Sequence, residues 1–484
     1  MPSVLYIHPA KLPGWVKRDG REAFASYQVM PVGAIGLANM LLQAGFAVTG
    51  LNYAMELDIN PQFDLQTWLR RREVPLLVMV DLHWLEHSFG ALEVARVCRG
   101  AFPDTPVVLG GMTASLYAGE ILEEFPQVQF VIRGDAEVGL NELAWHLAVG
   151  EPRLPQVANL SFRQDGEVHH NPLSYTASTA DLDSLDFVEL GFLEHCESYR
   201  LRQSSQYGVL RGHWLCVGRG CTLDCCWCGG GRAAQEHIAG RHGLVLRSPN
   251  RLAQDMRRLA DEGVQQAALT HDLALGGPQY AERVLTGMRQ DGARLGLWHQ
   301  QFQLPSAEFL DALAASAPPE ACLLELSPLS GNEAVRRRNG KFFSNAEFLK
   351  ALRRCGELEL PVFVYFSLNL PGESEHTYPE TLALARRVRE VCPVHLLRMS
   401  NMYHTIDPGS PMATDPAKHG LRLKWDGFVG YYRYCQQPVE VEDTRAATDL
   451  RGFEAVEQPP LAEMFDQWVD LCDELGEDTC LHFP

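Results

Sequence analysis

Hydrophobic and polar positions alternate in a regular order through the first 150 residues of the chain. Short runs rich in Val, Leu and Ile indicate buried strands, and longer stretches between them have apolar residues at helical spacing. Strands are expected over 3–9, 46–53, 75–83, 106–111 and 130–135, and helices over 31–46, 88–102 and 137–150. Strands that alternate with helices favour an α/β fold, in which a parallel sheet is covered on both faces and ligands bind beyond the carboxyl ends of its strands.

The same alternation resumes near residue 209 and continues to residue 403. The segment 209–221 leads into a loop rich in cysteine. Further strands are expected over 265–272, 294–302, 321–328, 360–373 and 394–403, and helices over 247–263, 306–316, 345–355 and 377–391. This order predicts six βα units and therefore a partial (β/α)6 barrel of the TIM type, whose chemistry lies at the carboxyl ends of the strands.

Two stretches fall outside this alternation. Residues 151–205 are expected to be a linker, with a hairpin that turns at 164–166. Residues 414–484 are expected to form a small, mostly helical domain, in which 461–475 has the pattern of an amphipathic helix. The predicted division of the chain is 1–150, 151–205, 206–413 and 414–484.

Composition restricts the partners and the compartment that we expect. The chain has 484 residues and a formal net charge of −19, and because no basic stretch offsets this charge, nucleic acid is not an expected partner. No apolar run approaches the roughly 18 residues of a membrane-spanning helix. The first residues lack the features of a signal peptide, and the 13 cysteines then fit a reducing compartment, so we expect a cytoplasmic protein.

The most specific chemical feature is the run GRGCTLDCCWCGGG at 218–231. Cys221, Cys225 and Cys228 have the spacing CxxxCxxC, and three thiolates on one loop can hold three irons of a 4Fe–4S cluster. The fourth iron is then open to a small molecule that offers amine and carboxylate groups. Zinc, unligated cysteines and a disulfide are the alternatives, but zinc needs four ligands and the adjacent Cys226 is expected to point away from the loop.

With this loop the chain resembles the radical S-adenosylmethionine (SAM) superfamily. The segments 327–352, 368–388 and 407–412 are similar to barrel elements of its members that also bind cobalamin, and the segments 31–48, 103–115 and 130–143 resemble their cobalamin-binding domain. The resemblance implies an N-terminal Rossmann-like cobalamin-binding domain followed by a partial barrel. It also implies three cofactors, namely a 4Fe–4S cluster, SAM, and cobalamin in its methyl or hydroxo form.

The resemblance also implies where cobalamin binds, because the paired glycines of this family let the nucleotide tail of cobalamin lie against the sheet. The expected contacts are Asp81, His83, Trp84, Gly110, Gly111, Thr113, Gly134 and Glu137. Cobalamin domains of the methionine-synthase type carry DxHxxG, whose histidine ligates cobalt. Here Asp81 and His83 form DxH, but Glu86 replaces the glycine. His83 is therefore interpreted as a cobalt ligand, as a side chain lining the lower face of cobalamin, or as a core histidine.

In the barrel, the resemblance assigns roles to residues near the carboxyl ends of the strands. The expected SAM contacts are Gly229, Gly230, Ser327, Asn369, Pro371 and Gly372. Glu325 is expected to bind ribose hydroxyls or a substrate amine, Asp272 to line the pocket, and Arg336 to meet a substrate carboxylate. The alternative for each of these polar residues is an ordinary cap or loop group.

The resemblance implies an enzyme that methylates an unactivated carbon. In the family, cleavage of SAM yields a 5′-deoxyadenosyl radical that takes hydrogen from the substrate, and methylcobalamin delivers the methyl group. Ring contraction or cyclisation without methyl transfer is the first alternative, and a non-catalytic cobalamin carrier or sensor is the second. The expected partners are a small-molecule, peptide or lipid-like substrate and an external electron donor of the flavodoxin or ferredoxin kind.

Overall fold

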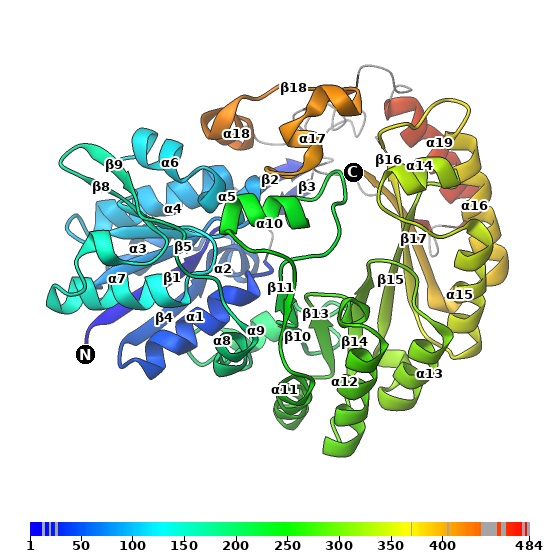
Figure 1. Ribbon diagram of the computed structural model, residues 1–484, viewed down its shortest axis with the longest axis horizontal. Helices are drawn as coiled ribbons and strands as arrows, with labels where there is room; N and C mark the ends of the chain where they lie inside the picture. Colours follow the sequence, from blue (N-terminus) through cyan, green and yellow to red (C-terminus); the bar gives the residue numbers. More distant parts are fainter. Residues whose placement is uncertain are drawn as a thin grey trace.

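Two seven-stranded sheets with helices packed against them form the body of the protein in the computed structural model (Figure 1). The structure describes residues 1–11, 15–18, 21–24, 28–368, 370–403, 406–436, 453–455, 461–476 and 480–481. In Figure 1 the sheet of the N-terminal part lies on the left and that of the C-terminal part on the right. Helix α10 (Arg232–Ala239), which follows the cysteine loop, lies between them.

The first sheet has the strand order β4-β1-β5-β6-β7-β8-β9. Its parallel strands are β1 (Ser3–His8), β4 (Ala47–Asn52), β5 (Leu77–Asp81), β6 (Val107–Gly110) and β7 (Phe130–Ile132). Every residue of β5 is buried, as its apolar run predicts for a strand covered on both faces. After β1 the chain adds β4 on one side of it, and then β5, β6 and β7 on the other side, so the strand order reverses between β1 and β5. Doubly wound sheets bind ligands at such a reversal, beyond the carboxyl ends of the strands.

Helices cover both faces of this sheet, and each face has its own core. Helices α1 (Val32–Gln43) and α7 (Glu137–Val149) pack against one face, and α4 (Ser88–Ala101) and α6 (Ala118–Glu124) pack against the other. The predicted α/β fold with a parallel sheet is therefore confirmed for the N-terminal part. The arrangement directs the carboxyl ends of β1, β5, β6 and β7 to one edge.

The second sheet has the order β10-β13-β14-β15-β16-β17-β20 and is parallel throughout. Its strands are β10 (Gly212–Leu215), β13 (Gln266–Leu269), β14 (Gly296–Gln301), β15 (Leu323–Leu329), β16 (Val362–Leu368), β17 (Leu397–Tyr403) and β20 (Cys480–Leu481). The first six follow one another in chain order, which confirms the predicted partial (β/α)6 barrel. The sequence did not predict β20, which extends the sheet from the far end of the chain.

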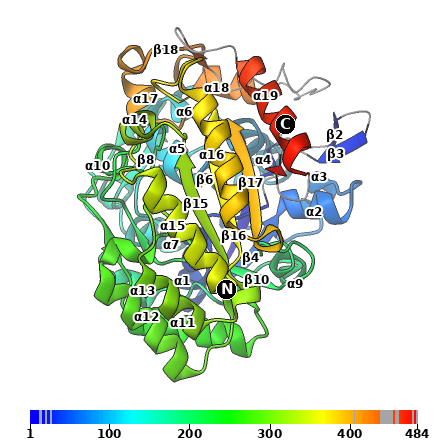
Figure 2. The ribbon, with the colours of Figure 1, turned by 90° about the vertical axis from the view of Figure 1, so that its right-hand side faces the viewer.

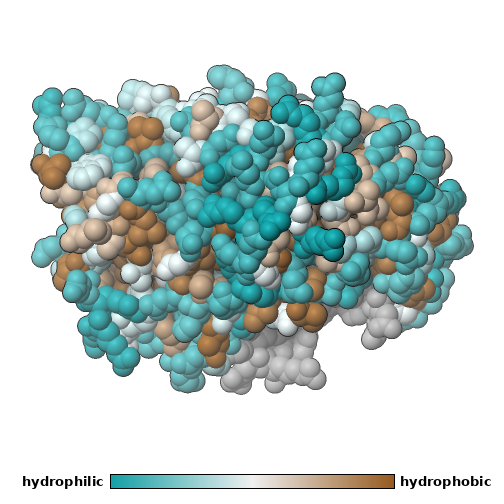
Figure 3. Space-filling view, turned by 90° about the horizontal axis from the view of Figure 1, so that it is seen from below, coloured by the Kyte–Doolittle hydropathy of each residue, from teal (hydrophilic) through white to brown (hydrophobic). Residues whose placement is uncertain are grey.

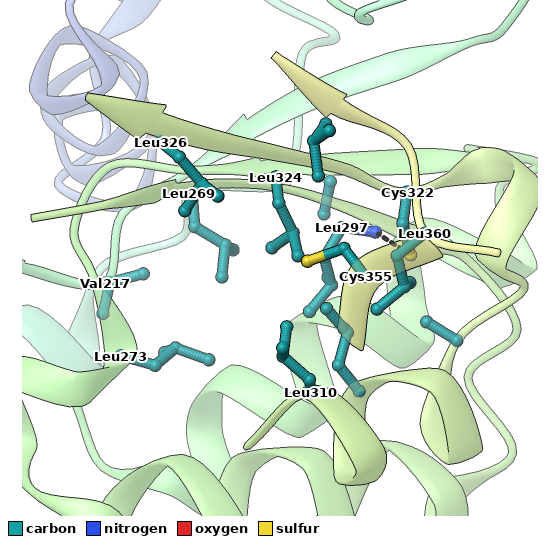
Figure 4. Packing of buried hydrophobic residues seen from close by; sticks show 14 of the residues in the cluster. Val217, Leu269, Leu273, Leu297, Leu310, Cys322, Leu324, Leu326, Cys355 and Leu360 are labelled. Atoms are coloured by element: carbon teal, nitrogen blue, oxygen red, sulfur yellow. Dashed lines mark hydrogen bonds between the residues drawn. The ribbon is translucent and has the colours of Figure 1, made fainter. Parts of the chain in front are cut away.

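The outer helices of the barrel pack against its strands through a continuous apolar layer. The helices are α11 (Pro249–Asp261), α12 (Pro278–Asp291), α13 (Ala307–Ser316), α15 (Asn345–Glu357) and α16 (Tyr378–Val391), and Figure 2 shows α15 and α16 lying across the strands. Figure 4 shows leucines of three strands in one apolar cluster with Leu310 of α13, and Cys322 accepts the Leu297 N–H at 3.4 Å. Burial of these side chains stabilises the barrel.

Two peripheral segments attach to the sheets. The predicted hairpin forms β8 (Leu160–Gln164) and β9 (Glu167–His170), and β8 pairs antiparallel with β7, so that the hairpin extends the first sheet. Helix α18 (Gly427–Gln436) begins at the carboxylate of Glu120, which accepts the Phe428 and Val429 N–H groups at 2.7 and 2.9 Å. Helix α19 (Leu461–Leu475) confirms the predicted amphipathic helix and packs against α16.

The surface is largely hydrophilic on the face seen in Figure 3, where hydrophobic residues occur in small groups. Within the described ranges, none of the helices combines the length and the apolar character needed to traverse a bilayer.

Candidate active site

The cysteine loop follows β11 (Gly218–Arg219), a two-residue strand just beyond the end of β10. Its partly exposed free thiols are those of Cys221, Cys225 and Cys228. Backbone amides donate to two of the sulfurs, from Leu223 to Cys221 at 3.4 Å and from Gly230 to Cys228 at 3.3 Å. Hydrogen bonds to sulfur are a regular feature of cysteines that ligate iron–sulfur clusters. The local backbone therefore suits thiolate ligands.

The separation of the sulfur atoms suits a cluster better than a single zinc ion. Among the described residues, only His8, Asp81 and His87 bring three metal-ligating atoms within 4.8 Å of one another. The three sulfurs of the cysteine loop are therefore spread more widely, whereas thiolates on one zinc ion lie about 3.8 Å apart. A wider spread suits sulfurs that bind separate irons of one cube.

The fourth cysteine of the loop faces another way. Cys226 is buried, and its thiol donates to Asn339 Oδ1 at 3.0 Å. The side chain packs with Ile406, Met412 and Leu421 in a small apolar cluster. This agrees with the expectation that adjacent cysteines point apart.

Burial of the loop makes free thiolates costly. It raises the pKa of Cys228 to about 12 and also raises the pKa of Cys225. A bound metal offsets this effect, because its positive charge favours the deprotonated ligand. Lys341 is buried close to the same sulfurs, its Nζ donates to the Phe302 carbonyl at 2.7 Å, and burial lowers its pKa. The sequence analysis did not identify Lys341.

A cavity of about 560 Å³ joins the cysteine loop to the carboxyl edge of the first sheet. Eleven of the predicted site residues line it: Asp81, His83, Trp84, Gly110, Gly111, Thr113, Gly134, Cys221, Cys228, Gly229 and Gly230. The first seven belong to the N-terminal sheet and the last four to the cysteine loop. The structure thus brings two sets of residues that are far apart in the sequence into one space.

The paired glycines at the end of β6, Gly110 and Gly111, have different surroundings. Gly111 has φ +112°, and an added Cβ would lie 2.7 Å from the Cα of His83, so that only glycine fits. Gly110 has no atom within 4 Å of an added Cβ, because that position opens into the cavity. Gly111 thus serves the fold, and Gly110 leaves room for a ligand.

This difference leads to a prediction. Replacing Gly110 by valine is expected to leave the stability of the apo-protein nearly unchanged but to weaken cobalamin binding at least tenfold, because the side chain fills the space beside the sheet. Titration of the absorbance of added cobalamin measures the affinity, and thermal unfolding of the apo-protein measures stability. Gly111→Val is the contrasting variant and is expected to lower stability itself. Unchanged cobalamin affinity in Gly110→Val would contradict the prediction.

The other predicted cobalamin contacts are held in place by the protein. Asp81 accepts from the Tyr6 hydroxyl at 2.7 Å and lies 3.0 Å from His8 Nδ1. The Thr113 hydroxyl donates to the His83 carbonyl at 2.9 Å, and the ring of His83 meets that of Trp84 edge-on at 4.9 Å. Burial lowers the pKa of His83, which keeps its imidazole neutral. His83 therefore lines the cavity as a neutral ring.

Arg219 connects the two sheets beside the cavity. Its guanidinium donates to Asp135 Oδ1 at 2.7 Å and to Glu137 Oε1 at 2.5 Å, and Arg241 forms a further ion pair with Asp135. The two acidic partners, Asp135 and Glu137, are buried, and they lie just before and at the first residue of α7. Glu137, predicted as a cobalamin contact, thus faces Arg219. No sequence motif indicated this pairing.

Asp407 is another residue that the sequence analysis did not single out. It lines the cavity, and its carboxylate accepts the Gly229 N–H at 3.0 Å. An added Cβ at Gly229 would lie 2.5 Å from the Pro408 carbonyl, so glycine is required where the loop and the 407–408 segment meet. Burial raises the pKa of Asp407 to about 7. A carboxyl group that titrates near neutrality suits proton transfer in a cavity.

Glu325 lies inside the barrel, next to the cavity wall. It is buried, and its Oε1 accepts from Trp298 Nε1 at 2.7 Å and from the Tyr365 hydroxyl at 3.3 Å. The ring of Trp298 packs 5.1 Å from that of Trp214, which lines the cavity. Burial raises the pKa of Glu325. Its place on β15 agrees with the predicted position, and its role as a ligand stays a prediction.

Asp272 and Arg336 use their polar groups within the protein. The carboxylate of Asp272 accepts the Ala274 N–H at 2.9 Å and the Phe302 N–H at 2.8 Å. Arg336 is completely buried and donates to the carbonyls of Pro328, Ser330 and Phe343 and to the Asn345 side chain. These bonds fix loops at the ends of strands, and the predicted contacts of both residues with a substrate remain predictions.

The remaining predicted SAM contacts lie on β15 and after β16. Ser327 is partly buried on β15, and the Pro371 carbonyl accepts from Asn339 Nδ2 at 3.2 Å. Gly372 has φ +90°, and Arg338 packs against it. Asn369 lies outside the described residues. Asn339 thus links this loop to Cys226 of the cysteine loop.

Each of the two segments that line this site matches a known protein family. Residues 23–144 match the B12 binding domain, and residues 215–385 match the Radical SAM superfamily. The chain belongs to the cobalamin-dependent radical SAM superfamily. It is a radical SAM enzyme, and the cofactors of the family are a 4Fe–4S cluster, SAM and cobalamin. The free thiols with their amide donors fit the cluster, and the open space at Gly110 fits a flat ligand against the sheet.

Solved structures support the fold. TsrM from Kitasatospora setae, a radical SAM methyltransferase, was solved with tryptophan substrate and the SAM analogue aza-SAM. It matches 88% of this chain and 79% of its own at 20% sequence identity, with a TM-score of 0.66. A second TsrM structure, with cobalamin and a [4Fe–4S] cluster, matches 88% of this chain and 77% of its own at 20% identity, with a TM-score of 0.62. At this identity the likeness establishes the fold.

Sequence relatives match smaller parts of the chain than the solved structures do. The anaerobic magnesium-protoporphyrin IX monomethyl ester cyclase of Synechocystis is 25% identical over 42% of this chain and 38% of its own length. The tRNA-2-methylthio-N(6)-dimethylallyladenosine synthase of Pelobacter propionicus is 26% identical over 37% of this chain and 41% of its own length. The chain thus spans about two fifths of these relatives.

Proposed function

We propose that this enzyme transfers a methyl group to a carbon atom of its substrate. The observation that carries the proposal is the single cavity that Gly110 and Gly111 line from one domain and Cys221 and Cys228 from the other. When bound, cobalamin supplies the transferable methyl group, and SAM at the cluster supplies the radical. A shared cavity suits this reaction, because both groups must reach one substrate carbon.

In this proposal the residues of the chain bind and orient the cofactors and shield them from solvent. The predicted cluster ligands hold the irons, the glycines at 229 and 230 leave room for SAM, and the residues from 81 to 134 that line the cavity hold cobalamin. Asp407 keeps a protonatable oxygen in the cavity, and Glu325 offers a buried carboxylate from the barrel. Residues 1–150 and 206–413 are the proposed cobalamin and radical SAM domains, joined by 151–205 and followed by 414–484.

Ring closure or contraction without methyl transfer is the second candidate. The similarity to a cyclase favours it, although that similarity covers 38% of the cyclase. A cobalamin carrier or sensor is the third candidate and needs no cluster, whereas the cysteine loop here retains its three thiols and amide donors. In either enzymatic case the proposed partners are a small-molecule, peptide or lipid-like substrate and an external electron donor.

One anaerobic assay separates these candidates. Reconstituted protein is incubated with cobalamin, SAM and a strong reductant, and S-adenosylhomocysteine and 5′-deoxyadenosine are quantified together. Both products are expected from a methyltransferase, because one SAM loads the methyl group and another is cleaved. 5′-Deoxyadenosine without S-adenosylhomocysteine would favour ring remodelling. Protein that binds cobalamin but no iron would favour the carrier.

A further inference from the structure

A short basic run stands out in an acidic chain. Residues 336–341, with the sequence RRRNGK, contain four cationic side chains and no acidic one, although the net charge of the chain is −19. Arg336 and Lys341 are buried, whereas Arg337 and Arg338 are exposed at the end of α14 (Glu333–Arg338). Two cations of this run therefore face the solvent.

The run lies against the outer side of the cysteine loop. Cys221 and Cys228 line the cavity, whereas Cys225 does not. Instead, Cys225 faces Gly340, where an added Cβ would lie 3.3 Å from its Sγ. Two residues further on, the side chain of Phe342 is 65% exposed. The segment 340–342 therefore leads from the sulfur of Cys225 to the protein surface.

Phe342 projects from a well-anchored backbone. Gln303 accepts the Phe342 N–H at 3.1 Å and donates to the Gly340 carbonyl at 2.9 Å. Lys341, between them, donates to the Phe302 carbonyl at 2.7 Å. A large aromatic side chain that is held in solvent by a fixed backbone has the character of an interface anchor, since Phe and Arg are enriched at protein interfaces.

In the part of the chain that the structure describes, the exposed cations beside it have no acidic salt-bridge partner. Lys418 is exposed next to His419. Burial, together with repulsion from Arg338 and Lys418, lowers the pKa of His419, and Asp415 opposes this shift. Within the described ranges, Arg337, Arg338 and Lys418 form no salt bridge. Two nearby acidic side chains accept backbone hydrogen bonds: Glu333 accepts the Asn345 N–H at 2.7 Å, and Asp415 accepts the Lys418 N–H at 3.4 Å.

We propose that Phe342, Arg337, Arg338 and Lys418 form the docking surface for an acidic one-electron carrier protein, which reduces the cluster through the Cys225 side. The inference rests on the proposed cluster and adds the location and the charge of the partner. One electron leaves the carrier and enters the cluster, and no bond is made or broken. Because the protein as a whole is acidic, only a local basic surface can steer an acidic partner to this side.

The test compares two reductants on the reconstituted holoenzyme. Stopped-flow absorbance measures the rate of cluster reduction by a reduced flavodoxin and, separately, by dithionite. Arg337→Glu/Lys418→Glu and Phe342→Ser are each expected to lower the flavodoxin rate constant about tenfold and to leave the dithionite rate unchanged. Increasing salt is expected to slow the flavodoxin reaction of the wild type more than that of the double variant.

The matched control reverses two exposed arginines of the N-terminal domain. Arg70→Glu/Arg71→Glu changes the net charge by the same amount and is expected to keep both rates. Equal flavodoxin rates in the wild type and in both test variants would overturn the docking surface, even if methyl transfer is observed. A wild-type dimer that Phe342→Ser dissociates would also overturn it by assigning the surface to a second copy. Absence of iron from the protein would overturn the proposed function as well.

Discussion

Cys225→Ala is expected to bind less than a tenth of the wild-type iron after reconstitution and to produce no 5′-deoxyadenosine. Three thiolates are the protein's whole predicted ligand set for the cluster, and the loss of one leaves two irons without a cysteine. The Cys228 N–H donates to the Cys225 carbonyl at 3.1 Å, and an alanine at position 225 keeps this backbone bond. Iron analysis and product analysis measure the two effects independently.

Cys226→Ala is the matched control for this prediction. Its thiol is one residue away but bonds Asn339 at 3.0 Å in a separate apolar cluster, so iron content is expected to stay at the wild-type value. Some loss of stability is expected instead, because the substitution leaves Asn339 Oδ1 without the thiol donor. Full activity of Cys225→Ala, or loss of iron in Cys226→Ala alone, would contradict the assignment of the ligands.

Arg219→Met is expected to lower the free energy of unfolding of the apo-protein by about 3–5 kcal/mol. The side chain of Arg219 is 18% exposed, and those of Asp135 and Glu137 are 6% and 7% exposed, so the substitution leaves a buried carboxylate without its cation. Arg241 still reaches Asp135, but Glu137 has no other salt-bridge partner among the described residues. Guanidinium denaturation of wild type and variant measures the change.

Arg232→Met provides the comparison on the same segment of the chain. Arg232 pairs with Asp224 at 2.6 Å, but these side chains are 59% and 29% exposed, so its loss is expected to change stability by about 0–1 kcal/mol. A double-mutant cycle of Arg219→Met with Glu137→Gln isolates the buried pair. If the Arg219 and Arg232 variants unfold at the same denaturant concentration, the ion pair does not hold the domains together.

Much of the fold was predictable from local patterns. The buried run of β5 and the alternation of strands with helices predicted both sheets. These features depend on residues close together in the sequence. The short β20, by contrast, pairs with β17 across some 80 intervening residues, and its two residues carry no strand pattern of their own.

The parts of the candidate site that could be predicted from the sequence are the motifs whose residues lie close together in the chain. The CxxxCxxC loop and the paired glycines are contiguous, and their residues line one cavity. Asp407 was missed because its bond to Gly229 joins positions 178 residues apart. Arg219 was missed because its partners lie more than 80 residues away, at the start of α7.

By itself, the sequence determined the types of element, their order, and the residues that can ligate a cluster, because hydrophobic periodicity and ligand spacing act over short stretches of chain. Only the tertiary structure decided that Gly110 opens into the same cavity as Cys221, that Glu137 pairs with Arg219, and that Cys225 faces an exposed Phe342. These depend on how the two sheets pack, which places side chains of distant segments in contact.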